Sequence, residues 1–109
     1  MKVVILVKSG PSTDDAGRAL QTADDMLAEG HAVSVYLLQE ATRFCQPRNN
    51  CPNTARFGEL TAKKLEVNVL TQDAELRGID VSAASGISNG TYESLVDLMA
   101  SSDRVVGLL

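Results

Sequence analysis

The sequence predicts an α/β fold, a three-layer α/β/α sandwich in which residues 1–109 form a single domain around a mostly parallel sheet of about five strands. The chain has 109 residues and is 44% hydrophobic, which is enough to close one core without metal or disulfide support. Short apolar runs, beginning with residues 3–7, are typical of strands buried on both faces. Stretches of helical periodicity separate these runs, and this alternation indicates right-handed crossovers between parallel strands.

The first half of the chain predicts two strands and the helix between them. Residues 2–8 form the first strand, which ends at the turn Ser9-Gly10-Pro11. Hydroxyl and carboxylate caps at residues 12–15 begin a helix whose inward face is mostly alanine, and Gly30 ends it. Residues 31–39 form the second strand.

The second half predicts smaller elements. We expect a helix over residues 52–65, a strand over 66–71, helical turns that end at Gly78, and a fourth strand over 81–84. Residues 85–91 are expected to be a loop. An amphipathic helix from Tyr92 to Met99 follows, capped by Asn89 or Thr91, and residues 104–108 close the sheet.

Composition excludes several classes of function. The net charge is −4 and the basic residues form no cluster beyond Lys63-Lys64, so binding of a nucleic acid is not expected. No apolar run approaches the roughly 18 residues of a membrane span, and the N-terminus lacks the features of a signal peptide. We therefore expect a cytoplasmic protein with no membrane partner.

In parallel sheets, functional residues lie in loops at the carboxyl ends of the strands. Here these are residues 9–14, 40–53, 71–73 and 85–91. The first loop matches no phosphate-binding motif, and Asp14 and Asp15 would compete with a phosphate, so helix capping is the simpler interpretation. For Asp73 and Arg77 the simple interpretation is likewise capping and a surface ion pair.

The loop "RFCQPRNNCPN" contains both cysteines of the chain, Cys45 and Cys51. A structural zinc site is not expected, because five residues separate the cysteines and the only histidine, His31, belongs to another element. A cytoplasmic protein keeps its thiols mostly reduced, which disfavours a structural disulfide. No sequence fingerprint of a cofactor is present, and none is expected.

Two interpretations of the cysteine loop stay open. If Pro52 is the first helical residue, Cys51 is the N-cap, where helix amides and the nearby Arg48 favour a thiolate; Cys51 is then the nucleophile and Cys45 the resolving thiol. If Asn53 is the N-cap instead, Cys51 is an ordinary loop residue and Cys45 a small buried hydrophobe.

Several short segments resemble the DsrE/DsrF-like family. They are the strand that ends in Ser9-Gly10-Pro11, the phrase at residues 29–33, the segment 67–79 with its Arg77-Gly78 pair, and the ending Asp-Arg-Val-Val at residues 103–106. The resemblance spans nearly the whole chain and implies a three-layer α/β/α sandwich. It also implies assembly as a trimer or hexamer, with identical or related subunits, and a role in passing persulfide sulfur.

The resemblance also identifies a departure. In carrier members of the family the persulfide-bearing cysteine lies at the end of the third strand, before the Arg-Gly pair, whereas this chain has Leu70 and Asp73 there. Any thiol chemistry then falls to the neighbouring loop.

Two functions therefore compete. The first is sulfur trafficking, in which Cys51 carries sulfane sulfur from a donor to an acceptor protein, Cys45 resolves it and Arg48 stabilises negative charge. The alternative is a non-catalytic oligomeric subunit, or a module that binds a small ligand or partner. An independent hydrolase or oxidoreductase is not expected, because no pair of nucleophile and base is present.

Overall fold

The computed structural model describes residues 1–46, 51–81, 86–107 and 109 and contains one five-stranded sheet in the order β4-β3-β2-β1-β5. Every neighbouring pair of strands is parallel. The strands are β1 (Lys2–Val7), β2 (Ala32–Leu37), β3 (Glu66–Leu70), β4 (Ile87–Gly90) and β5 (Arg104–Val106). The predicted α/β class is confirmed.

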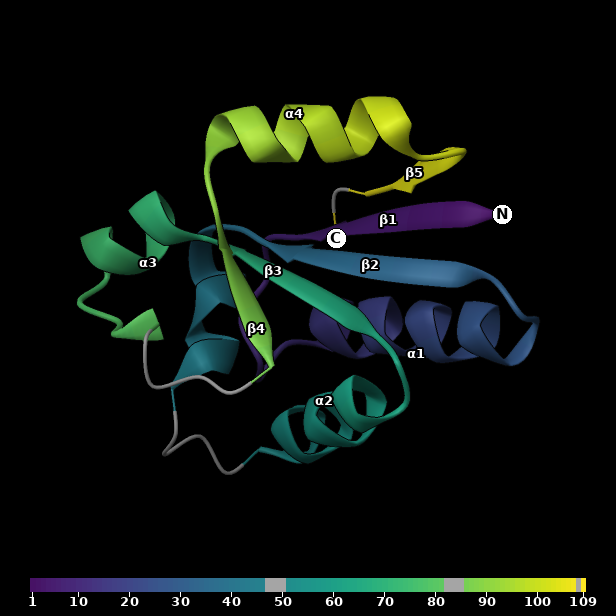
Figure 1. The fold of residues 1–109 in the computed structure, drawn as a ribbon. Coiled ribbons are helices and arrows are strands. Elements are labelled where there is room, and N and C mark those ends of the chain that lie inside the picture. The colour runs from purple at the N-terminus through teal and green to yellow at the C-terminus, as the bar shows by residue number, and fades with distance from the viewer. Residues whose placement is uncertain (47–50, 82–85, 108) are drawn as a thin grey trace.

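Helices cover both faces of this sheet, which confirms the three layers (Figure 1). On one face lie α1 (Asp14–Ala28) and α2 (Pro52–Ala62), and on the other lies α4 (Tyr92–Ser101). The short α3 (Thr71–Leu76) and the 3₁₀ helix η1 (Gln39–Cys45) follow directly after the carboxyl ends of β3 and β2. No helix of these described segments is long and apolar enough to cross a membrane.

The core has two parts, one on each face of the sheet. The larger part joins alternate strand residues such as Val3, Ile5 and Val35 to the alanine face of α1, which lets that helix approach the sheet closely. The smaller part, under α4, consists of Tyr36, Leu70 and Leu95 with partly buried neighbours. The larger core is therefore made by helices that leave β1 and β2, the strands at the centre of the sheet.

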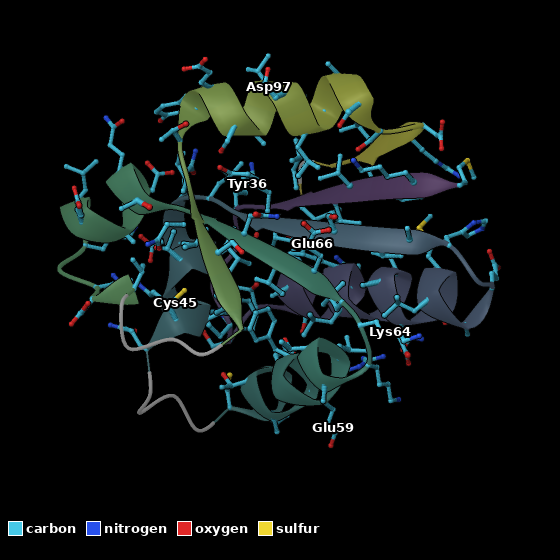
Figure 2. The ribbon with its side chains drawn as sticks, viewed as in Figure 1. Tyr36, Cys45, Glu59, Lys64, Glu66 and Asp97 are labelled. Atoms are coloured by element: carbon cyan, nitrogen blue, oxygen red, sulfur yellow. The ribbon has the colours of Figure 1, made fainter. Side chains whose placement is uncertain are left out.

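Tyr36 joins the sheet to α4, as Figure 2 shows. Its side chain is buried, and its hydroxyl donates to the carbonyl of Thr91 at 3.0 Å and lies 2.9 Å from the Ser94 hydroxyl. Gly90 leaves the room for this ring, because a Cβ there would overlap the Tyr36 hydroxyl. The end of β4 and the start of α4 are thus fixed by a residue of β2.

The prediction for residues 81–91 was wrong in part. The fourth strand is Ile87–Gly90, inside the segment expected to be a loop, and Val81 lies in a 3₁₀ turn; residues 82–84 fall outside the described part of the chain. Serine, asparagine and glycine have low strand propensity, but pairing with β3 overrides that preference. Thr91, rather than Asn89, caps α4 through a capping box with Ser94.

Smaller differences concern where elements end. Residues 39–45, expected to be the last strand residue and loop, form η1, and α2 ends at Ala62 before Lys64 takes a positive φ of 78°. The start of α1 is as predicted, with the Thr13 side chain accepting the amide of Ala16. The last strand is shorter than expected, and Leu108 lies outside the described residues.

Candidate functional site

The candidate site lies where the polypeptide leaves β1, β2 and β3. Three segments meet there: residues 8–13 after β1, η1 after β2, and α3 after β3. The start of α2 joins them, because its side chains bond to the backbone of residues 11–13. We refer to these four segments together as the carboxyl edge of the sheet. Sequence reasoning placed functional residues there, and the parallel sheet confirms that these segments share one edge.

Cys51 is the N-cap residue of α2, and Pro52 follows at the first helical position. Of the two interpretations of the loop, the structure therefore has the one with Cys51 as N-cap. The Cys51 thiol donates to the carbonyl of Pro11 at 3.3 Å, and Thr54 Oγ1 lies 3.2 Å from the sulfur. The sulfur thus lies between the start of α2 and the loop that follows β1.

This setting lowers the pKa of the Cys51 thiol from its ordinary value. The main cause is the hydrogen bond from the Thr54 side chain, and the backbone amides at the start of α2 act in the same direction, while partial desolvation opposes them. A lowered pKa places more of the thiol in the nucleophilic thiolate form at neutral pH.

Asn53 fixes the start of α2 in a different way from the predicted alternative. Instead of capping the helix, its amide Nδ2 donates to the carbonyls of Pro11 and Thr13, at 2.8 and 3.1 Å. The Asn53 side chain packs against Gly17 of α1, where a Cβ would lie 3.4 Å from Asn53 Oδ1. Asn53 therefore sets the position of Cys51 against the loop that follows β1.

Cys45 has the opposite environment. It ends η1, is 4% exposed, and belongs to the core on the α1 and α2 side of the sheet. Its neighbour Phe44 stacks on Phe57 with the ring centroids 4.7 Å apart. Desolvation raises the pKa of the Cys45 thiol to about 11, so at neutral pH this residue is a protonated, buried group.

Both cysteines are thiols in this structure. Of the three predicted site residues, Cys51 begins α2 and Cys45 ends η1, so both belong to the carboxyl edge, but Cys45 is buried in the core; Arg48 lies outside the described residues. In the described ranges, no three His, Cys, Asp or Glu side chains are grouped so that they could hold a metal ion.

Sequence reasoning missed a charged cluster at the same edge. Glu40 of η1 pairs with Arg43 on the same helix and with Arg77 at the end of α3, the latter at 2.9 Å. These two hydrogen bonds lower the pKa of the Glu40 carboxyl, with Arg43 as the larger cause. The spacing of Glu40 and Arg43 was visible in the sequence, but their meeting with Arg77 depends on the pairing of β2 with β3.

Asp73 and Arg77 were predicted to be a cap and a surface ion pair, and the structure gives each a more specific role. The Asp73 carboxylate is 8% exposed and accepts the backbone N–H of Gln39 at 2.8 Å. Arg77 is the C-cap residue of α3, and its side chain reaches both Glu40 and the carbonyl of Asp73.

A second feature of this edge is an open depression of about 630 Å³ between α3 and α4. It is lined by Thr71, Gln72 and Glu75 on one side and by residues 90–93 on the other. Its lining supplies hydroxyl, amide and carboxylate groups rather than a thiol.

The comparisons with known proteins agree with this architecture. A model of the DsrE/DsrF-like family matches residues 1–108. The crystal structure of the ychN protein from E. coli superposes with a TM-score of 0.78 at 17% identity, over 98% of this chain and 97% of that one. The protein of unknown function MTH1491 from Methanobacterium thermoautotrophicum gives 0.76 at 10% identity, over 97% and 98%. None of the curated proteins compared matches the chain.

Proposed function

Because the chain belongs to the DsrE/DsrF-like family, we propose that it takes part in sulfur trafficking and carries sulfane sulfur on Cys51. The observation that supports this most directly is the environment of Cys51, an N-cap thiol at the carboxyl edge whose pKa is lowered by Thr54 and by helix amides.

The proposed step is a transfer between persulfides. The Cys51 thiolate attacks the outer sulfur of a donor persulfide, the donor's S–S bond breaks, and the donor leaves as a thiolate with the electron pair of that bond. Cys51 then holds the persulfide, and no net oxidation takes place. Transfer to an acceptor thiol repeats the same exchange, with Cys51 as the leaving group.

Cys45 and Arg48 have supporting roles in the proposal. Only an accessible thiolate attacks a persulfide. Because Cys45 is buried and its pKa is raised, it would act as the resolving thiol only after η1 moves. Arg48 is proposed to stabilise negative charge near Cys51. We also propose that the chain assembles with itself, as a trimer or hexamer, or with related subunits.

The experiment is intact-mass measurement after the reduced protein is incubated with a persulfide donor. The wild-type protein and Cys45→Ser should each gain one sulfur atom that a reducing agent removes, and Cys51→Ser should gain none. A Cys51→Ser protein that still gains sulfur would reject Cys51 as the carrier.

One observation favours the alternative function, a non-catalytic subunit or binding module. The positions that resemble the family's carrier site hold Leu70, which is 1% exposed in the core, and Asp73, which is bonded to the Gln39 backbone. Neither can carry sulfur. If no form of the protein gains sulfur in the mass experiment, this alternative becomes the working function, and the depression beside α3 becomes the surface to pursue.

A further inference from the structure

Two arginines from different elements meet at one exposed carboxylate on the carboxyl edge. Arg43 Nε donates to one oxygen of Glu40, and Arg77 Nε donates to the other at 2.9 Å. The Glu40 side chain is 51% exposed, whereas that of Arg77 is 22% exposed. Glu40 is the only carboxylate that pairs with the two guanidinium groups among the described residues, although the buried Asp73 carboxylate lies nearby, on the Gln39 amide.

The backbone next to this cluster has an unusual conformation. Gln39, directly before Glu40, has a φ of 47°, a region that residues other than glycine rarely adopt. The buried Asp73 carboxylate accepts the Gln39 amide, and Arg77 donates from Nη1 to the carbonyl of Asp73 at 3.1 Å. Such strain persists only where surrounding contacts maintain it, and it occurs preferentially at functional sites.

Several donors of the two guanidinium groups remain available. Each arginine has five N–H donors. Within the described residues, the hydrogen bonds use Nε of Arg43 together with Nε and Nη1 of Arg77, and leave both Nη atoms of Arg43 and Nη2 of Arg77 without an acceptor. Both side chains are anchored through Nε to the same carboxylate, so these donors belong to one cluster.

One short loop connects the cluster to Cys51. Gly10 packs against Glu40, since a Cβ there would lie 3.7 Å from the Glu40 Cβ. The next residue, Pro11, accepts the Cys51 thiol at 3.3 Å. Adjacent loop residues thus contact the arginine cluster and the candidate sulfur carrier.

We propose that Arg43 and Arg77 form a subsite for the anionic end of a small sulfane-sulfur donor, binding its sulfonate or carboxylate oxygens. The inference rests on the proposed function, because it assigns the donor that would load Cys51. Arginine recognises such oxygens through paired, charge-assisted hydrogen bonds. The bound anion shares the arginines with Glu40, whose own charge weakens its binding.

The test is a binding titration that involves no covalent step. A Cys51→Ser protein is titrated with thiosulfate, sulfate and acetate at low ionic strength, and binding is followed by shifts of amide NMR signals. Arg43→Gln and Arg77→Gln should each weaken anion binding about tenfold, as expected for one charge-assisted hydrogen bond. Glu40→Gln should bind several-fold more tightly than its parent.

Arg18→Gln is the matched control. Arg18 forms an ion pair with Asp15 on α1 at 2.7 Å. Its replacement removes the same charge from an ion pair outside the cluster and should leave anion binding unchanged. Because Arg77 also bonds to the backbone, the unfolding midpoint of each variant is measured as well, and Arg43→Gln alone tests the subsite if Arg77→Gln unfolds.

The outcomes separate this inference from the proposed function. Preference for sulfate supports a thiosulfate-type donor, and preference for acetate supports a donor with a carboxylate; binding of neither, or binding that Arg43→Gln does not weaken, overturns the subsite. In a parallel experiment, the protein with Cys51 intact is mixed with thiosulfate. The Cys51 thiolate would take the outer sulfur of thiosulfate, and the S–S bond would break to release sulfite. If anions bind in an arginine-dependent way but Cys51 gains no sulfur, thiosulfate does not load Cys51, while the anion subsite is still supported.

Discussion

The carboxylate of Asp73 accepts the backbone N–H of Gln39 at 2.8 Å, and so joins the segments that follow β3 and β2. Asp73 lies where the sequence resemblance places a sulfur carrier. In this chain the position fixes the shape of the carboxyl edge, because Gln39 keeps its positive φ next to the Glu40 cluster. The carboxyl edge is therefore held in shape partly by a residue at a position where the resemblance implies a thiol.

Replacing Asp73 should destabilise the protein. Asp73→Ala removes the part-buried hydrogen bond that the Gln39 amide donates to a charged group, which we expect to cost about 1.5–3 kcal/mol of the free energy of unfolding. Asp73→Asn keeps an oxygen acceptor and should lose less. Urea unfolding followed by circular dichroism measures both.

Glu75→Ala is the control for Asp73, since Glu75 is an exposed carboxylate on the same short helix. Its unfolding free energy should stay within about 0.5 kcal/mol of the wild type, as is usual for surface changes. Equal losses in Asp73→Ala and Glu75→Ala would contradict a specific role for the bond to Gln39.

Removing the Thr54 hydroxyl should make Cys51 less reactive. The hydrogen bond from Thr54 is the largest cause of the lowered Cys51 pKa, so Thr54→Val should raise that pKa and move the pH profile of alkylation to higher pH. At neutral pH, Cys51 of the variant should react more slowly with iodoacetamide. Mass spectrometry of quenched samples gives the rate at each pH.

Thr61→Val provides the matched comparison for Thr54. Thr61 lies on the same helix, but its hydroxyl donates to the carbonyl of Phe57, away from Cys51. The alkylation profile of this variant should coincide with that of the wild type. A Thr54→Val profile that also coincides would show that the helix amides alone set the reactivity of Cys51.

The buried Cys45 thiol should make the folded state less stable at alkaline pH. Its pKa is about 11 in the folded protein, against an ordinary value of 9.0, so the unfolded chain loses this proton first as pH rises. The unfolding free energy should therefore fall above pH 9, by about 1.4 kcal/mol at pH 10, and this loss should level off only as the pH rises past the folded pKa of about 11.

Cys45→Ala isolates that contribution. The variant removes the thiol with a small change in volume, and its stability should decline less between pH 8 and pH 10 than that of the wild type. Burial also raises the pKa of Tyr36, so a smaller alkaline loss should remain in the variant. Identical slopes in the two proteins would contradict a pKa as high as 11 for Cys45.

The sequence predicted the sheet elements that lie in apolar runs and misplaced the one that has no apolar run. β1, β2 and β3 are rich in valine and leucine, and their hydrophobic pattern carries the signal. β4 reads Ile-Ser-Asn-Gly and lies at the edge of the sheet, where one neighbour is enough to pair it. Its strand conformation comes from β3 and from the space that Gly90 leaves for Tyr36.

The candidate site also has one part that the sequence indicated and one part that it did not. Proline after Cys51 was a local signal, and it correctly indicated the N-cap position of that thiol. The cluster of Glu40, Arg43 and Arg77 could not be inferred, because residues 40 and 77 meet only when β2 and β3 lie side by side.

By itself, the sequence determined the fold class, the order of most elements and the edge of the sheet at which chemistry is expected. These follow from hydrophobic periodicity, helix caps and the geometry of parallel strands, all of which act over short stretches of chain. Tertiary structure alone decided which cysteine is exposed to reaction and which charges surround it. Burial and the meeting of side chains distant in sequence set those properties, since desolvation raises the Cys45 pKa while Thr54 and helix amides lower that of Cys51.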